Sequence, residues 1–208
     1  MKKIAITQRL IKNKDYFEIR EALDINYCKF MKACGFLPII IPYEVNFKEY
    51  FKNIKLDGLI LSGGNDLGVC NKNALSIKRD NFEKKLLKYC INFNIPVFGT
   101  CRGMQIIANF FKSTFKKIEG EVGTRDKLIF LKKSNFIKSL DYSKKVNSYH
   151  NFKIDRLGKD LISVAKNKRG VIKVIEHKRY KIFGQMWHCE REKKFLQNDI
   201  RIFQEFFK

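Results

Sequence analysis

The sequence predicts an α/β fold with a mostly parallel central sheet and helices on both of its faces. Short apolar runs of strand length alternate with amphipathic, helix-like patterns through the first half of the chain. Glycine-containing turns follow two of the apolar runs, at residues 62–64 and 99–103. The carboxyl ends of parallel strands meet at one edge of a sheet, so both turns are expected at that edge.

Hydrophobic spacing gives the elements of the first half. Short apolar runs predict strands at 3–6, 37–41, 57–61 and 95–98. Between them, apolar residues at steps of three and four predict helices over 15–34, 46–54 and 80–93, and a further helix from Met104. Gly35 stands where the first of these helices should end.

The second half is less regular and predicts a small additional β region. Leu128–Leu131 is predicted as a strand and Val146–His150 as the end of another. Residues 171–175 and 180–187, joined through a basic turn, predict a hairpin. A final helix from about residue 191 is expected to bury five apolar side chains: Phe195, Leu196, Ile200, Phe203 and Phe207.

Length and composition suit one domain spanning residues 1–208, since 45% of the residues are hydrophobic and no repeat or linker divides the chain. The N-terminus carries no long apolar run, so we expect a cytoplasmic protein that makes no use of a membrane. The six cysteines form no C-x-x-C pair and no zinc spacing, which predicts reduced thiols and no metal site.

The formal net charge of +22 has two interpretations. A strongly positive field attracts polyanions or anionic substrates. A coding bias toward lysine would instead spread the charge over every solvated surface. The lysines are scattered from end to end and no nucleic-acid motif accompanies them, which argues against nucleic-acid binding and leaves an anionic small molecule open.

The segment Gly99-Thr100-Cys101-Arg102-Gly103 joins a predicted strand to a predicted helix. Small residues on both sides of Cys101 permit a tight, strained turn with the thiol at its apex, as in the nucleophile elbow of serine hydrolases. The helix N-terminus and the Arg102 cation should both favour the thiolate. The alternative is an inert, buried cysteine at a strand end.

A base and its partner are predicted at His188 and Glu190, directly after an apolar strand. In an extended segment, residues two apart share a face, so the carboxylate could orient the imidazole for a thiol nucleophile. The alternative is a surface pair. The paired glycines Gly63 and Gly64 could direct N–H groups at an anionic oxygen, or could simply form a turn.

Together these motifs resemble a known family. Gly99-Thr100-Cys101-Arg102-Gly103-Met104-Gln105 is similar to the G-x-C-x-G-x-Q elbow of class I glutamine amidotransferases, and Gly184-Gln185-Met186-Trp187-His188-Cys189-Glu190 is similar to their G-x-Q-[FW]-H-P-E segment. The resemblance covers nearly the whole chain and implies their flavodoxin-like sandwich. It also implies Cys101 as nucleophile, His188 as base and acid, Glu190 as its orienter, and the N–H groups of Gly64 and Arg102 as the oxyanion hole.

Cys-Arg-Gly, Gly-Gly-Asn-Asp and Val146–His150 resemble the free-standing γ-glutamyl hydrolases of this family. That resemblance implies substrate contacts at Gly63, Asn65, Gln105, Ser148, Tyr149 and His150. Cys189 replaces the proline of the His-x-Glu segment, Asn151 stands where that branch usually has a second histidine, and the region after Glu119 is short. The last two departures leave the leaving group open.

The expected function is hydrolysis of a small-molecule γ-glutamyl amide through a glutamyl thioester, with no cofactor. The favoured substrate is an anionic γ-glutamyl conjugate, with the γ-glutamyl-CDP-amidate of capsule phosphoramidate synthesis as one candidate. Two alternatives remain open: a glutaminase subunit that delivers ammonia to a partner synthetase, and a polyanion binder that has kept the fold without catalysis. The oligomeric state is not indicated by the sequence.

Overall fold

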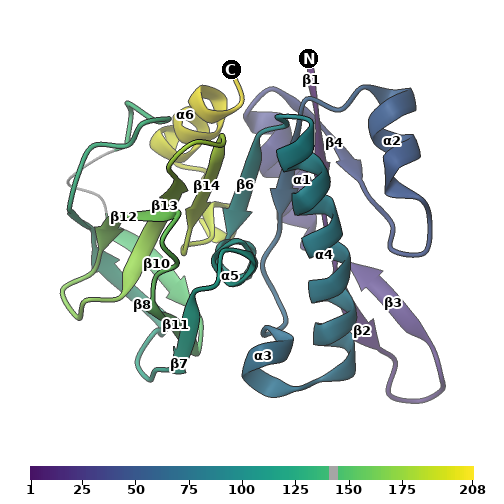
Figure 1. Ribbon diagram of the computed structural model, residues 1–208, viewed down its shortest axis with the longest axis horizontal. Helices are drawn as coiled ribbons and strands as arrows, with labels where there is room; N and C mark the ends of the chain where they lie inside the picture. Colours follow the sequence, from purple (N-terminus) through teal and green to yellow (C-terminus); the bar gives the residue numbers. More distant parts are fainter. Residues whose placement is uncertain (141–144) are drawn as a thin grey trace.

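An eight-stranded sheet organises the fold (Figure 1). The computed structural model describes residues 1–140 and 145–208. The first five strands in the sheet order pair in parallel, and the last three continue it with antiparallel pairing. In sheet order the strands are β4 (Phe36–Ile40), β1 (Lys2–Ile6), β5 (Gly58–Leu61), β6 (Val97–Thr100), β14 (Ile182–Gln185), β13 (Ile172–His177), β12 (Leu161–Lys166) and β9 (Ile129–Phe130).

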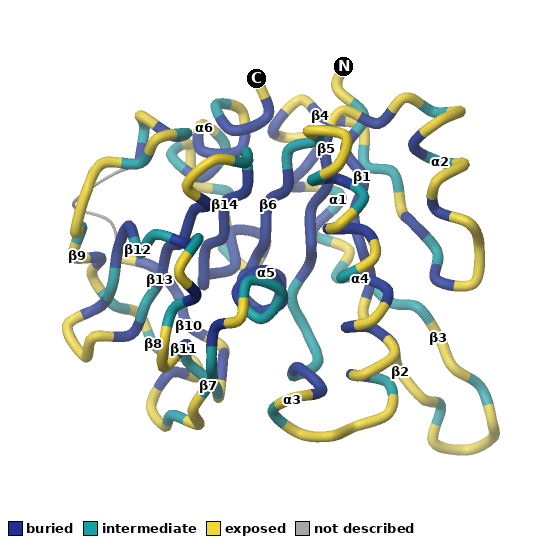
Figure 2. Tube along the Cα trace, in the orientation of Figure 1, coloured by how far each residue is buried: buried dark blue, intermediate teal, exposed yellow. Residues whose placement is uncertain are grey.

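Helices pack on both faces of this sheet and create two apolar cores. Leu59 and Leu61 of β5 belong to the core on one face, and Ile60 between them belongs to the core on the other. This alternation is the two-residue period of a strand. One face is covered by α2 (Phe47–Ile54), α4 (Ala74–Asn92) and α5 (Arg102–Phe110), and the other by α1 (Ile25–Ala33) and α6 (Gln197–Phe206). Figure 2 shows the buried strands between helices that are exposed on their outer sides.

Within residues 1–140 and 145–208, three two-stranded sheets lie outside the central one. They pair β2 (Arg9–Lys12) with β3 (Ile19–Ala22), β7 (Thr114–Lys117) with β11 (Phe152–Arg156), and β8 (Val122–Lys127) with β10 (Lys145–Tyr149). The last two sheets are the additional β region that was expected in the second half. Among the described residues, no helix combines the length and apolar character needed to cross a bilayer.

The predicted α/β class and the strand–helix alternation of the first half are confirmed. The strands at 3–6, 37–41, 57–61 and 95–98 appear with ends shifted by one or two residues, and the short helix near 46–54 is α2. The helix expected at 80–93 is α4, which begins six residues earlier because Asn73 caps it by accepting hydrogen bonds from the N–H groups of Leu75 and Ser76. A short helix, α3 (Gly68–Asn71), was not predicted.

The helix predicted over 15–34 is wrong in its first half. Residues 9–22 form the β2–β3 hairpin, and α1 begins only at Ile25. The apolar side chains of Tyr16 and Ile19, which suggested a buried helical face, are 57% and 39% exposed. Asp24 sets the true start, since its carboxylate accepts a hydrogen bond from the N–H of Asn26. Gly35 does end the helix, in a left-handed conformation (φ +82°).

In the second half the predicted hairpin is confirmed as β13–β14, whereas β7, β8, β11 and β12 were missed. β7, β8 and β11 mix charged with apolar residues, so their hydrophobic period is weak, whereas β12 is a mostly apolar run that was missed. The final helix is shorter than predicted and begins at Gln197. Phe203 and Phe207 are buried as expected, but Leu196 precedes the helix and is 37% exposed.

Gly103 shows how tightly α5 packs on the sheet. A Cβ atom at this position would lie 1.9 Å from the carbonyl oxygen of Leu61 on β5, which is far inside van der Waals contact. Any side chain there must therefore push the helix that follows Cys101 away from the neighbouring strand.

We predict that Gly103→Ala lowers the free energy of unfolding by about 3 kcal/mol or more, because two backbone segments must separate. Gly170→Ala is the matched control. Gly170 has a left-handed backbone (φ +74°) and open space around it, so the change should cost only about 1 kcal/mol of conformational strain. Urea unfolding of both variants measures the difference, and equal costs would contradict the close-packing argument.

Candidate active site

Three strand ends meet at the carboxyl edge of the parallel sheet. β5 leads into Ser62–Gly64, β6 leads into Cys101, and β14 leads toward His188. The N–H of Cys101 donates a 2.8 Å hydrogen bond to the carbonyl of Gln185, which fastens the end of β6 to the end of β14. The fold therefore brings together the three motifs that are far apart in the sequence.

The segment around Cys101 has the strained geometry expected of a nucleophile elbow. Cys101 has φ +52° and ψ −106°, an unusual conformation for a residue with a side chain, and it immediately precedes α5. A Cβ atom at Gly99 would lie 2.5 Å from the carbonyl oxygen of Gly103. The two glycines are thus required because the two sides of the turn touch.

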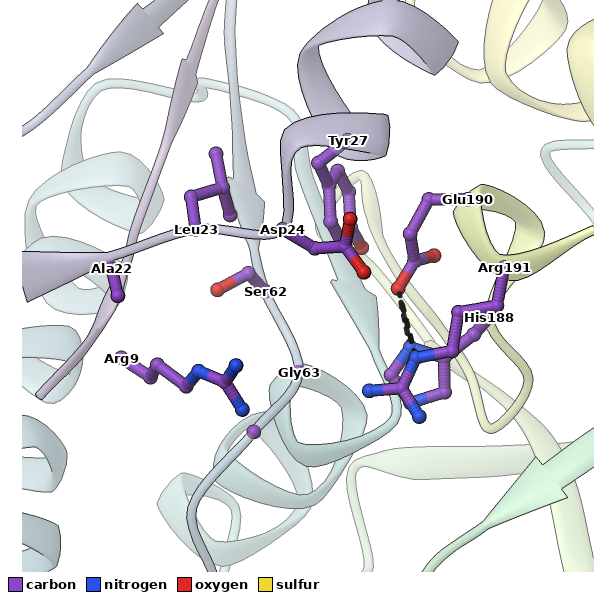
Figure 3. Close-up of a pocket in the computed structure, with 11 residues that line it drawn as sticks. Arg9, Ala22, Leu23, Asp24, Tyr27, Ser62, Gly63, His188, Glu190 and Arg191 are labelled. Atoms are coloured by element: carbon purple, nitrogen blue, oxygen red, sulfur yellow. Dashed lines mark hydrogen bonds and ion pairs between the residues drawn. The ribbon is translucent and has the colours of Figure 1, made fainter. Parts of the chain in front are cut away.

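His188 forms a hydrogen-bonded chain with Cys101 and Glu190. Its Nδ1 lies 2.5 Å from Oε1 of Glu190, and its ring also hydrogen-bonds the thiol of Cys101. The sequence argument assumed an extended segment, but residues 189–191 form a 3-10 helix, η1 (Cys189–Arg191). The dyad forms nonetheless, because the turn of η1 brings the Glu190 carboxylate back to the imidazole (Figure 3).

The charges of this chain favour a thiolate–imidazolium pair. Burial alone would raise the pKa of Cys101, but the His188 charge and hydrogen bond, helped by Arg191, outweigh it and lower that pKa. Burial likewise opposes protonation of His188, yet the Cys101 and Glu190 charges raise its pKa to about 9. Near neutral pH the thiol is therefore primed as a nucleophile.

Arg102 does not supply the cation that the sequence suggested for the thiol. Its guanidinium is buried and pairs with the carboxylates of Asp80 and Glu83 on α4. The charged end of the side chain is thus directed toward α4, and the backbone N–H of Arg102 remains near Cys101. The nearby cations are instead His188 and Arg191.

Two buried residues that the sequence did not single out hold the site together. Arg79 of α4 donates to the carbonyl oxygens of Ser62 (2.8 Å), Gly63 (2.9 Å) and Gly64 (2.7 Å). Asn147 of β10 clamps the base: its Oδ1 accepts from the N–H of His188 and its Nδ2 donates to the carbonyl of that residue, both at 2.8 Å. Arg79-x-x-x-Glu83 could have been noticed, but the spacing is also typical of an ordinary surface ion pair.

The glycines of the loop after β5 allow close contacts that a side chain would block. A Cβ atom at Gly63 would lie 2.5 Å from Cε1 of His188, so Gly63 lets the imidazole pack against the loop. Gly64 has a left-handed backbone (φ +80°). Within the described residues, neither the Gly64 N–H nor the Arg102 N–H donates a hydrogen bond.

A cavity of about 190 Å³ opens beside Cys101. Among the predicted substrate contacts, those that line it are Asn65, Gln105, Tyr149 and His150. Gly63 instead lines an adjoining recess. Ser148 lines neither, because its hydroxyl is buried and bonds Glu121 (2.9 Å) and Lys173.

His150 faces the cavity as a neutral ring. Its Nδ1 lies 3.1 Å from the carbonyl of Phe152 and its Nε2 lies 3.1 Å from the ammonium of Lys173. The carbonyl can only accept and the ammonium can only donate, so the proton is on Nδ1. Burial and the Lys173 charge lower the pKa of His150 to about 4. Among the described residues, no group of three or more His, Cys, Asp and Glu side chains could hold a metal ion.

Comparison with known proteins gives consistent matches. The peptidase C26 family model matches residues 4–190. The γ-glutamyl-CDP-amidate hydrolase of Campylobacter jejuni subsp. jejuni serotype O:2 is 40% identical, over 98% of this chain and 96% of that protein.

Two solved structures are similar in fold, at identities below 25%. A putative GMP synthase component from Thermoplasma acidophilum has a TM-score of 0.76, 23% identity, and coverage of 100% of this chain and 92% of the other. A glutamine amidotransferase from Thermotoga maritima has a TM-score of 0.70, 13% identity, and coverage of 98% and 83%.

Iodoacetamide should modify Cys101 before the other five thiols, because the thiolate is the reactive form. The lowered pKa of Cys101 keeps the thiolate present below the usual thiol range, so its rate advantage over a free thiol should be largest at roughly pH 6–8. In contrast, burial raises the pKa of Cys34 to about 12 and that of Cys70 to about 11, so these thiols serve as internal controls. Mass spectrometry after timed labelling gives the rates.

His188→Ala tests the cause of this reactivity. Without the imidazolium, burial is the largest influence on the thiol and its pKa should rise, so the reactivity of Cys101 should shift to higher pH. An unchanged pH profile in this variant would contradict the ion pair.

Proposed function

The chain belongs to the peptidase C26 family, and we propose that it hydrolyses the amide bond of a γ-glutamyl compound and releases L-glutamate. The observation that carries this proposal is the hydrogen-bonded chain Cys101–His188–Glu190 at the strained elbow. A primed thiol with an oriented base is the arrangement that nucleophilic amide hydrolysis needs. We further propose that residues 1–208 act as one catalytic domain.

The first half of the reaction makes a thioester. The Sγ of Cys101 attacks the γ-carbonyl carbon, and a tetrahedral oxyanion forms. The imidazolium of His188 then gives a proton to the leaving nitrogen, the C–N bond breaks, and the amine departs. Glu190 holds the Nδ1 side of the ring and stabilises its positive charge throughout this step.

The second half returns the enzyme to its starting state. Neutral His188 takes a proton from water, the hydroxide adds to the thioester carbon, and the C–S bond breaks to release glutamate. The thiolate and the imidazolium are thereby regenerated. These steps use side chains and water and require no cofactor.

Backbone donors near Cys101 suit the oxyanion. The N–H groups of Gly64 and Arg102 have no partner within the described residues and belong to the two turns beside the thiol. Each such donor is worth about 3 kcal/mol of transition-state stabilisation. Arg79 supports them indirectly, because it fixes the carbonyl groups of residues 62–64 and so orients the peptide units of the loop.

The glutamyl part of the substrate fits the cavity lined by Gln105, Tyr149 and His150. Gln105 uses its Nε2 to donate to the carbonyl of Phe152 (2.9 Å), so its Oε1 is the atom available to an α-ammonium group. The ring nitrogens of His150 and the hydroxyl of Ser148 are already bonded within the protein. Residues 148–150 therefore contribute to substrate binding through the shape they give the cavity and through their backbone groups.

For the leaving group we propose an anionic conjugate such as γ-glutamyl-CDP-amidate. The relative at 40% identity carries that substrate in its name, and the +22 charge of this chain favours anions in general. Incubation with γ-glutamyl-CDP-amidate, γ-glutamyl-γ-aminobutyrate and glutamine, with released glutamate measured, tests the choice. Glutamine as the best substrate, with turnover only beside a synthetase partner, would indicate an ammonia-delivering subunit instead. Salt-sensitive binding to nucleic acid, with no glutamate released from any compound, would indicate a polyanion binder.

Substitution of the three proposed catalytic residues should give graded losses. Cys101→Ala should abolish turnover, and His188→Ala should lower kcat roughly a thousandfold or more. Glu190→Gln should be milder, roughly ten- to a thousandfold, because the amide still accepts the imidazole N–H but does not stabilise the imidazolium. Glutamate release measures all three, and Cys28→Ser on α1 serves as the control. Equal, negligible effects at residues 188 and 190 would remove the pair from the mechanism.

A further inference from the structure

We propose that Arg9 and Arg191 form a subsite for a phosphoryl group bonded to the scissile nitrogen. The inference rests on the proposed hydrolysis of γ-glutamyl amides and assigns residues to the leaving-group side of that same site. The recess that they line lies beside His188, the charge of Arg9 is unpaired within the described residues, and local contacts place both arginines.

Two hollows meet at the catalytic base. The 190 Å³ cavity that contains Cys101, Gln105 and His150 lies on one side. A recess lined by Arg9, Ser62, Gly63 and Arg191 lies on the other, and the two hollows share Gly64, His188 and Arg191. Because the acyl group must lie next to Cys101 and the leaving nitrogen next to His188, a substituent on that nitrogen extends into the recess.

The recess carries more positive charge than its acids neutralise. Within the described residues Arg9 makes no ion pair and no hydrogen bond through its guanidinium. The acids that face it are already engaged: Asp24 caps α1, and Glu190 bonds His188 and lies 3.9 Å from Arg191. Figure 3 shows the guanidinium groups of Arg9 and Arg191 directed toward each other across the recess. Two convergent guanidinium groups are well suited to phosphoryl oxygens.

Both arginines are held in position. Arg9 is followed by Leu10, whose N–H and carbonyl both bond the side-chain amide of Asn65 in the glycine-rich loop (3.3 and 3.2 Å). The side chain of Arg9 then packs over Gly64, where an added Cβ atom would lie 2.8 Å from its Cδ. Arg191 lies over the ring of Tyr149, with its Cζ 4.8 Å from the ring centroid. The backbone after Arg9, the stem of its side chain and the Arg191 guanidinium are therefore already placed before a ligand binds.

The space beyond Arg9 suits the rest of a nucleotide. The recess beside His188 is narrow, about 30 Å³, so the sugar and base of a nucleotide must lie outside it. Arg9 also lines a second groove, of about 570 Å³. Most of the side chains along this groove are uncharged hydrogen-bonding or apolar groups, among them Asn65, Asn71 and Asn73, and the charges of Lys12 and Asp66 also line it.

Arg9→Ala is the decisive variant, because Arg191 also affects the Cys101 thiol. The wild type and the variant are assayed with γ-glutamyl-CDP-amidate and with γ-glutamyl-4-nitroanilide, which share the acyl group and differ in the charge of the leaving group. We expect Arg9→Ala to lower the ratio of the two specificity constants roughly 10- to 100-fold, as for loss of a hydrogen bond to a charged group. Arg9→Lys should restore part of that ratio. Arg20→Ala, which removes an exposed arginine from the same hairpin, should leave the ratio unchanged.

A second measurement does not depend on turnover. Inorganic pyrophosphate, standing in for the leaving group, should slow iodoacetamide labelling of Cys101 in the wild type and in Arg20→Ala. Roughly tenfold more of it should be needed in Arg9→Ala.

The outcomes separate the inference from the function on which it rests. An unchanged ratio of the two specificity constants in Arg9→Ala, or unchanged protection by pyrophosphate, would overturn the subsite. Cleavage of the nitroanilide but not of the phosphate-bearing substrate by the wild type would overturn the subsite and leave γ-glutamyl hydrolysis standing. Cleavage of neither compound would overturn both.

Discussion

The site depends on a buried ion-pair network between α4 and the two turns that hold the chemistry. Glu83 lies between the guanidinium groups of Arg79 and Arg102, and Asp80 also pairs with Arg102. Arg79 reaches the glycine-rich loop, while Arg102 is the first residue of α5 directly after Cys101. The network therefore fixes the distance between the two proposed oxyanion donors, which come from separate strands. Removal of one partner from such a buried set typically costs about 3–5 kcal/mol, because the remaining charge is left uncompensated.

This network also determines how the thiol is activated. The Arg102 guanidinium pairs with Asp80 and Glu83, so Arg102 contributes no free cation beside Cys101. Its proposed contribution to the site is its backbone N–H. Activation then falls to His188, whose pKa of about 9 depends in turn on the Cys101 and Glu190 charges. In such a site, transfer of the Cys101 thiol proton to His188 produces the thiolate that is the proposed nucleophile. That same proton is the one the leaving nitrogen needs.

Sequence reasoning was accurate where the chemistry is local and weaker where it depends on burial. The elbow and the contact between His188 and Glu190 could be predicted because both lie within short segments, although the pair forms through the turn of η1 and not through the extended segment that was expected. Arg79 could not, because a charged residue four positions from an acid on a helix is usually exposed, and nothing in the spacing indicates that it is buried. The β2–β3 hairpin was missed for a related reason: Tyr16 and Ile19 follow helical steps but are exposed. Arg9 lies beside the site because the hairpin folds back onto Asn65.

The distribution of charge around His188 gives the net charge of +22 a more specific meaning. On the glutamyl side, the buried ammonium of Lys173 is matched by Glu121 at 2.6 Å, and it keeps His150 neutral rather than adding a second cation. On the proposed leaving-group side, Arg9 makes no ion pair within the described residues and stands beside Arg191. A glutamyl group carries both an ammonium and a carboxylate, so a locally balanced cavity suits it, whereas a phosphoryl leaving group needs excess positive charge. In the proposed assignment, the two sides of the site are distinguished by the placement of Arg9 and Arg191 relative to His188 and not by the total charge of the chain.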